Sequence, residues 1–273
     1  MTFSTLMVHL ELEDSNDARL RIAGELAEQF DAKLIGIAAS DPHPSYYADG
    51  AVAQGFVEHE RAELKKRMAD AEARFRAATG QRLRAIEWRC AMERPADYVA
   101  REARAADLVI TGVNRDGILV DRLRRLDPSD LVMQAGRPIF LVPPEVDYLK
   151  LQNVLVAWKD TREARRAVAD ALPLLHKAKE VNVIEVVAGD ASRSAAQERV
   201  IDVVAWLGRQ EILAFPRVMH ADDEADQIDR IWKSGADVVV AGAYGHSRLR
   251  EWVFGGVTRN LITRSRHCSF LTH

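Results

Sequence analysis

The sequence predicts an α/β protein with two tandem doubly wound domains, each with a five-stranded parallel sheet in the order 3-2-1-4-5 and helices on both faces. Two observations carry this prediction. Short apolar runs, typical of strands buried on both faces, alternate along the 273 residues with segments whose apolar residues recur at helical spacing. The two halves of the chain also resemble each other, and such self-similarity indicates a repeated structural unit.

The repeat is visible at a spacing of 130 residues. The segment AADLVITGVNRD, residues 105–116, matches GADVVVAGAYGH, residues 235–246, and PIFLVP at 138–143 lies opposite CSFLTH at 268–273. Between the two copies, VPPEVDYLKLQ contains two prolines, which end a strand, followed by a largely polar remainder. We therefore expect one domain over residues 1–144 and a second over residues 151–273.

The strands and helices of the first copy follow one another in the order that a doubly wound sheet requires. Apolar runs predict strands at 6–12, 33–38, 86–91, 107–112 and 138–143. The segment from about Val57 to Thr79 predicts a long helix between the second and third strands. Each pair of successive parallel strands needs such a crossover connection.

The second copy repeats this order. Apolar runs predict strands at 153–158, 181–187, 213–220, 237–242 and 267–272, and helices are expected at 196–210 and 224–235. A helix after the first strand is indicated by six apolar residues on one stripe: Ala164, Ala167, Val168, Ala171, Leu172 and Leu175. Asp160, with Glu163 three residues later, fits a capping box, so this helix should begin just after Lys159.

Composition excludes several classes of function. The net charge of −3 and the isoelectric point near 6.3 give no overall basic footprint for nucleic acid. No apolar run approaches the ~20 residues of a membrane helix, and the N-terminus has no basic leader. The two cysteines, Cys90 and Cys268, are far apart in sequence and suit a reducing compartment. We expect a cytoplasmic protein that binds neither nucleic acid nor membrane.

Glycines after the fourth strand of the second copy predict a ligand site. In a doubly wound sheet the crevice lies at the carboxyl ends of the first and fourth strands. Gly242 and Gly245 allow the backbone there to turn and approach a ligand, and Gly255 and Gly256 expose N–H groups at the start of the next helix. Such a helix start favours a phosphate, to which the Thr258 hydroxyl can add a hydrogen bond.

This arrangement resembles the nucleotide loop of the universal stress protein family, whose motif is Gly, two residues, Gly, nine residues, Gly and then usually Ser or Thr. Gly242, Gly245 and Gly255 match the motif, whereas Gly256 replaces the usual hydroxyl residue. The resemblance covers nearly the whole chain as two fused copies. By position it implies an ATP site, with magnesium as a companion ion, that is formed by Ala157, Trp158, Lys159, Asp160, Val186, Ala241, Gly242, Tyr244, Gly245, Gly255, Gly256, Val257 and Thr258.

One departure from the family concerns the residue after the first strand. The family commonly places Asp there as an adenine contact, but this chain has Lys159 at that position and Asp160 one residue later. Either Asp160 takes over the adenine contact or the selectivity for adenine weakens. The alternative is that Asp160 only caps the helix and Lys159 is a solvated charge.

The first copy lacks the phosphate loop. At the spacing of 130, Gly112 is kept, but Arg115 and Arg125 replace Gly245 and Gly255, and Pro128 replaces Thr258. Arginine side chains lie where backbone must approach phosphate, and proline has no N–H to donate. We therefore expect one nucleotide per chain, bound in the C-terminal domain.

Three functions remain open from the sequence. The first is a regulatory stress-response protein that binds ATP without being an enzyme, the second is a slow ATPase or nucleotide switch, and the third is an interaction module that needs no nucleotide. The resemblance also implies that the two fifth strands pair, so that one chain forms an internal pseudo-dimer. We also expect a protein partner of unknown identity. A further homodimer is possible through the long helix of the first copy.

Overall fold

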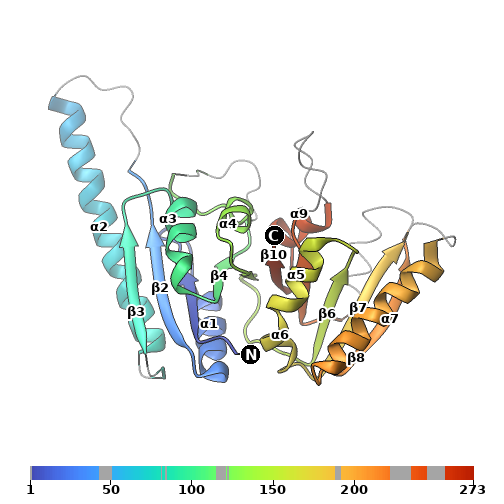
Figure 1. The fold of residues 1–273 in the computed structure, drawn as a ribbon. Coiled ribbons are helices and arrows are strands. Elements are labelled where there is room, and N and C mark those ends of the chain that lie inside the picture. Colours follow the sequence, from blue (N-terminus) through green and yellow to red (C-terminus); the bar gives the residue numbers. More distant parts are fainter. Residues whose placement is uncertain are drawn as a thin grey trace.

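A single sheet runs through the computed structural model, which describes residues 2–42, 51–80, 82–83, 85–114, 121, 123–187, 192–221, 235–244 and 256–273. Within these ranges ten strands are hydrogen-bonded in the order β3-β2-β1-β4-β5-β10-β9-β6-β7-β8. Each half therefore has the predicted order 3-2-1-4-5, read inward from its own outer edge. The two halves lie side by side, and the long helix α2 extends beyond the outer edge of the first (Figure 1).

The elements of the first half confirm the predicted alternation of strands and helices. They are β1 (Thr5–His9), α1 (Asp17–Phe30), β2 (Lys33–Ala39), α2 (Ala51–Thr79), β3 (Ile86–Ala91), α3 (Pro95–Glu102), the 3-10 helix η1 (Ala103–Ala105), β4 (Leu108–Gly112), α4 (Pro128–Gln134) and β5 (Ile139–Val142). Strand β1 ends at His9, three residues earlier than predicted, because the segment from Glu11 turns into a loop held by Asn16. The Asn16 amide accepts from the Glu11 N–H at 2.9 Å and donates to the Glu11 carbonyl at 2.8 Å.

The second half contains β6 (Asn153–Trp158), α5 (Arg162–Asp170), α6 (Leu172–Leu175), β7 (Glu180–Val187), α7 (Arg193–Arg209), β8 (Ala214–His220), β9 (Val238–Gly242), α9 (Gly256–Thr263) and β10 (Cys268–Thr272). Most of the helix expected at 224–235 lies outside the described residues. The predicted apolar stripe from Ala164 to Leu175 is buried throughout. It is divided between two helices, because Pro173 lies in the first turn of α6 and cannot donate an N–H to a continuous helix.

The predicted cap of α5 is wrong by one residue. Thr161, rather than Asp160, is the N-cap, and its hydroxyl accepts from the Ala164 N–H at 3.3 Å. The backbone at Thr161 is still extended, with φ −129° and ψ 162°. Asp160 therefore lies outside the helix and has its carboxylate available for other contacts.

The two fifth strands join the halves, as the sequence predicted. Strands β5 and β10 pair antiparallel, with Phe140 opposite Phe270, and every residue of both strands is buried. An open strand edge of this kind would expose unpaired N–H and C=O groups and invite association with other chains. The antiparallel ladder covers both edges at once.

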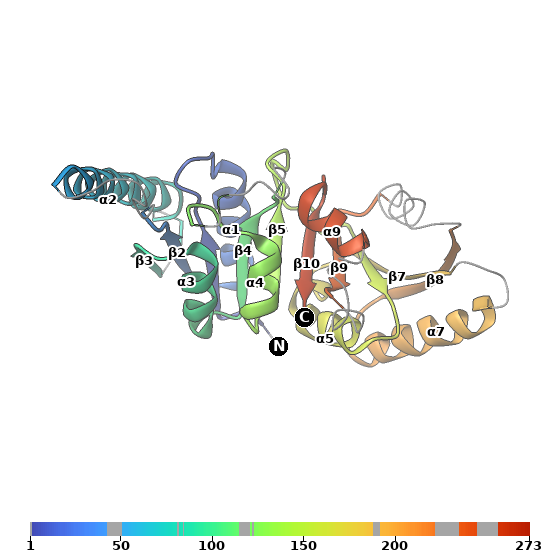
Figure 2. The ribbon, with the colours of Figure 1, turned by 90° about the horizontal axis from the view of Figure 1, so that it is seen from above.

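Helices cover the sheet on both faces. One core cluster contains Leu20, Phe75, Val168 and Leu207 from α1, α2, α5 and α7, and the other contains Val99, Leu131 and Leu261 from α3, α4 and α9. Figure 2 shows α5 and α7 on one side of the second half and α9 on the other. No helix in the described ranges combines the length and the apolar character that crossing a membrane requires.

Candidate functional site

The first and fourth strands of the second half are neighbours, which places their carboxyl ends together. Strands β6 and β9 pair in parallel, with Ala157 opposite Ala241. Trp158 ends β6 and Gly242 ends β9, so the loops that follow leave the same edge of the sheet. Ligand crevices of doubly wound sheets lie at this position.

Gly242 lies against the first turn of α5. A Cβ atom at this position would come within 2.5 Å of the Ala164 nitrogen and 2.6 Å of the Glu163 carbonyl carbon. Both atoms belong to backbone, so no side chain can be accommodated here without moving the helix. The sequence predicted that Gly242 allows the backbone to approach a ligand, whereas the structure shows that the lack of a side chain here makes room for α5.

The chain beyond Gly242 is held in a defined turn. The Ala243 N–H donates to the Thr272 carbonyl at 2.7 Å, and the Ala243 carbonyl lies 3.0 Å from Nδ1 of His273. Tyr244 is buried and has φ +62°, in the left-handed region that residues other than glycine seldom adopt. These contacts fix the backbone immediately after β9, at Ala243 and Tyr244.

Only part of the predicted phosphate loop can be placed. Gly245 and Gly255 lie outside the described residues, as does the side-chain environment of Val257. Helix α9 begins at Gly256, which agrees with the expectation that the last glycines precede a helix. Thr258 lies in the first turn of α9 and is 8% exposed.

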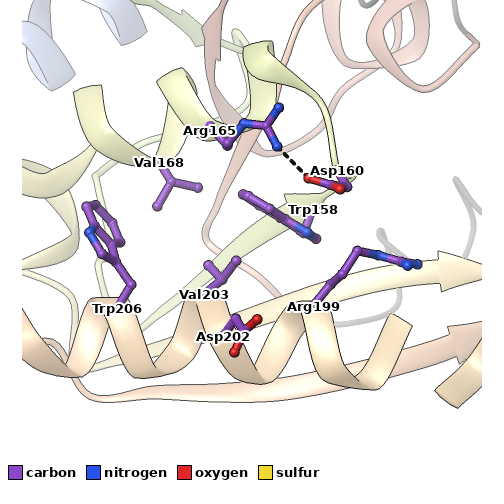
Figure 3. A pocket seen from close by; sticks show the side chains of 8 residues that line it. All are labelled: Trp158, Asp160, Arg165, Val168, Arg199, Asp202, Val203 and Trp206. Carbon is purple, nitrogen blue, oxygen red and sulfur yellow. Dashed lines mark hydrogen bonds and ion pairs between the residues drawn. The ribbon is translucent and has the colours of Figure 1, made fainter. Parts of the chain in front are cut away.

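A pocket of about 420 Å³ opens beside Trp158, between α5 and α7 (Figure 3). Its apolar walls are the indoles of Trp158 and Trp206 together with Val168 and Val203. Trp158 is 9% exposed, and its indole Nε1 has no hydrogen-bond acceptor among the described residues. The pocket thus combines flat apolar surfaces with one buried donor.

Charged side chains surround this pocket. Oδ1 of Asp160 accepts from Nη1 of Arg165 at 2.5 Å. On the opposite wall Arg199 donates from Nε and Nη2 to the Glu185 carboxylate, at 3.1 and 2.5 Å. These hydrogen bonds raise the pKa of Arg199 and keep its guanidinium charged. Asp202 also lines the pocket.

The structure divides the predicted site residues between the two faces of the sheet. Trp158 packs in the cluster beneath α5 and α7, whereas Ala157, Val186, Ala241 and Tyr244 belong to the cluster beneath α9. Lys159 is exposed. The alternation of side chains along a strand causes this division, so a single pocket brings together only Trp158 and Asp160 of the predicted set.

Sequence reasoning missed Arg165, Arg199 and Trp206 as lining residues. Arg199, Asp202, Val203 and Trp206 recur at helical spacing on one face of α7, which was a readable signal. That this face meets α5 across Trp158 depends on packing between elements far apart in sequence.

The corresponding crevice of the first half is built differently. Pro128 is in the first turn of α4, and Asp127 caps this helix by accepting from the Ser129 N–H at 2.9 Å. Gly112 at the end of β4 is covered by the guanidinium of Arg19, whose Cζ would lie 3.2 Å from an added Cβ. In our interpretation the start of α9 receives phosphate in the second half. The equivalent helix start in the first half, that of α4, is capped by the chain's own Asp127.

Comparisons with known proteins identify the fold. No protein-family model and no curated protein matches the chain. Among solved structures, a universal stress protein from Archaeoglobus fulgidus DSM 4304 aligns over 98% of this chain and 95% of its own, with 13% identity and a TM-score of 0.70. Protein PA1789 from Pseudomonas aeruginosa PAO1, described as functionally unknown, aligns over 99% and 92%, with 13% identity and a TM-score of 0.58. The chain has the universal stress protein fold over nearly its whole length.

Proposed function

We propose that the chain is a universal stress protein that binds one adenine nucleotide, ATP, in its C-terminal half and acts as a regulatory binding protein rather than as an enzyme. The pocket beside Trp158 is the observation that carries this proposal. It lies at the carboxyl end of β6, next to the strand whose terminal Gly242 begins the glycine loop. The fold alone does not identify the ligand, but the apolar aromatic walls of the pocket favour a planar base.

The base is recognised by stacking and by one hydrogen bond. Indole faces attract the π-face of a nucleobase, and such stacking contributes about 1–3 kcal/mol per base. Trp158 Nε1 supplies a donor whose hydrogen bond remains unmade among the described residues. Asp160 accepts from Arg165 but is half exposed, and its carboxylate is placed to receive a ribose hydroxyl at the mouth of the pocket.

The phosphates extend from this mouth toward the start of α9. Helix N-termini attract anions through their free N–H groups. Gly256 begins α9 and has no Cβ to crowd an anion at those groups, and the Thr258 hydroxyl would add a donor in the same turn. Magnesium would arrive bound to the triphosphate, since this ion is usually held by substrate phosphates and a small number of carboxylates.

The regulatory role rests on occupancy of this site. A nucleotide that contacts α7, β6 and α9 would order surfaces on both faces of the second half. A protein partner or a second copy of the chain can recognise these surfaces. The two free cysteines, Cys90 and Cys268, suit the cytoplasm expected from composition.

Calorimetric titration with ATP, with and without magnesium, tests the proposal. We expect one site per chain. Trp158→Ala should weaken ATP binding roughly tenfold or more through lost stacking, whereas Trp158→Phe keeps an aromatic face and should lose less. Trp88→Phe in β3 is the matched control and should leave the affinity unchanged. Gly245→Arg, which copies Arg115 of the first half, should abolish binding in a folded protein.

Two equivalent sites per chain, or no affinity for adenine nucleotide under either condition, would show the proposal to be wrong. If Trp158→Ala binds ATP with the same affinity as the wild-type protein, the base does not bind in this pocket, and the nucleotide site lies elsewhere.

A further inference from the structure

Arg19 in the first half is a buried cation without a contacting carboxylate. It is 8% exposed, and its guanidinium donates to two backbone carbonyls, those of His9 at 3.1 Å and Ser15 at 3.4 Å. No acidic oxygen of the described residues lies within ion-pair distance of it. A guanidinium has five N–H donors, so most of its hydrogen-bonding capacity is unused.

The surrounding charges are already engaged with other groups. Asp14 pairs with Arg125, and Arg21 pairs with Asp147 at 3.0 Å. Oε1 of Glu11 accepts from the Leu126 N–H at 3.3 Å. Asp17 accepts from the Ser15 hydroxyl at 3.0 Å. Among the described residues Arg19 has neither an ion pair nor a side-chain hydrogen-bond partner, because its only acceptors are the two backbone carbonyls.

Arg19 faces a cavity of about 500 Å³ at the carboxyl ends of β1 and β4. The lining includes Gly112 and Val113 from the end of β4 and Asp14 and Ser15 from the loop before α1. The guanidinium lies over Gly112, where an added Cβ would be 3.2 Å from both Cζ and Nε. Glycine at the end of β4 thus allows Arg19 to reach the cavity.

Burial of an unpaired charge is costly, and proteins normally meet that cost with a partner of opposite charge. Desolvation lowers the pKa of Arg19, and the charges of Glu11 and Asp14, which lie beyond ion-pair distance, offset this only in part. A planar guanidinium binds carboxylate and phosphate in bidentate fashion. The missing partner therefore has the chemistry of a small oxyanion.

We propose that the first half carries a second ligand site, in which Arg19 binds the phosphate or carboxylate group of a small molecule in the cavity between α1 and the end of β4. This site is independent of the nucleotide site in the second half. It uses a side chain where the second half uses backbone, so the loss of the glycine loop from this half changes the type of site and does not abolish it. Asn16, bonded to the Asp14 carbonyl at 3.1 Å, fixes the loop that forms the cavity rim.

The test is thermal unfolding and calorimetry of the full chain with two probes, inorganic phosphate and succinate, against sodium chloride of equal ionic strength. We expect phosphate, succinate or both to raise the unfolding midpoint and to give saturable heats. Phosphate alone would assign a phosphoryl ligand, and succinate alone a carboxylate. Arg19→Met should weaken the effective probe roughly tenfold or more, because a bidentate charge-assisted contact is lost.

Three variants separate this site from its surroundings. Arg21→Met is the matched control, since Arg21 lines the same cavity but is already paired, and it should keep the affinity within about twofold. Gly112→Ala should weaken binding by displacing the guanidinium. Thr258→Val removes the hydroxyl proposed to contact phosphate in the other half, so probe binding that persists in this variant belongs to the first half. Circular dichroism verifies the fold, and Arg19→Lys replaces Arg19→Met if the latter does not fold.

Failure of both probes to bind the wild-type protein would overturn the proposal, whatever the variants do. Equal binding by the Arg19 variant and the wild-type protein would overturn it as well. A loss of phosphate binding on Thr258→Val would assign the ion to the second half. None of these outcomes depends on whether ATP binds at Trp158.

Discussion

Gly242 offers a sharp test of how the crevice is built, through the substitution Gly242→Ala. The added Cβ would meet the Ala164 nitrogen at 2.5 Å and the Glu163 carbonyl carbon at 2.6 Å. Ordinary carbon contacts are about 3.5–4.0 Å, so the first turn of α5 must move by roughly an ångström. Overpacking of this kind costs about 1–3 kcal/mol in the free energy of unfolding.

Two other glycines provide matched controls. Gly24 in α1 has no atom within 4 Å of its added Cβ, so Gly24→Ala should stabilise the protein by about 0.5–1 kcal/mol through helix propensity. At Gly112 the nearest atoms belong to the flexible end of Arg19, at 3.2 Å. Gly112→Ala should therefore cost less than Gly242→Ala, since a side chain yields more readily than helix backbone.

Urea denaturation followed by circular dichroism orders the three variants. We expect the free energy of unfolding to increase from Gly242→Ala to Gly112→Ala to Gly24→Ala. If Gly242→Ala were as stable as the wild-type protein, the contact between the end of β9 and α5 would be looser than the structure shows. The same variant should also weaken ATP binding, because α5 carries Arg165 and its movement reshapes the pocket.

Three further predictions concern other parts of the chain. Burial, followed by the charge of Arg19, holds the pKa of His9 well below its usual value of 6.5, so the unfolded state binds more protons under mild acid. Stability should therefore fall as the pH drops below about 6.5. His9→Leu should lessen that fall, which is measured by comparing the urea midpoints of the variant and the wild-type protein at neutral and acidic pH. The raised pKa of Glu11 acts in the opposite direction, equally in the variant and the wild-type protein. Expressed alone, residues 151–273 should self-associate in light scattering through the uncovered β10; a well-folded monomer would contradict this. Burial raises the pKa of Cys268 to about 12, so a thiol reagent should modify exposed Cys90 in the native protein and both cysteines only after unfolding.

The sequence predicted the fold well because burial on both faces leaves a direct imprint on it. The predicted ranges of β3 and β6 match the structure residue for residue, since both strands are bounded by polar or turn-forming segments. The pairing of β5 with β10 was also predictable, because two apolar edges in one chain have few other ways to be covered. The cap of α5 was not, since Asp160 and Thr161 are both good caps and the end of β6 decides between them.

The candidate site was less predictable because it depends on packing across the sequence. Trp206 lines the same pocket as Trp158 only because α7 lies across that pocket from α5, which no local pattern encodes. Arg19 escaped notice for a different reason. At the spacing of 130 it corresponds to Leu149 in the linker, whereas in space Arg19 and Ala164 both lie against the glycine that ends the fourth strand of their half. The loop between β1 and α1 is longer than that between β6 and α5, and the constant spacing fails across it.

This difference in loop length bears on how the two halves can carry different chemistry. In a symmetric dimer of identical chains, a change that placed an arginine over the glycine at the end of β4 would alter both crevices at once. Within one chain the same change alters only the first half, while the ladder between β5 and β10 still covers both edges. Gly242 receives helix backbone and Gly112 receives a guanidinium, so the same residue type serves a backbone contact in one half and a charged side chain in the other. The joined sheet therefore keeps the halves paired while the two crevices differ in structure.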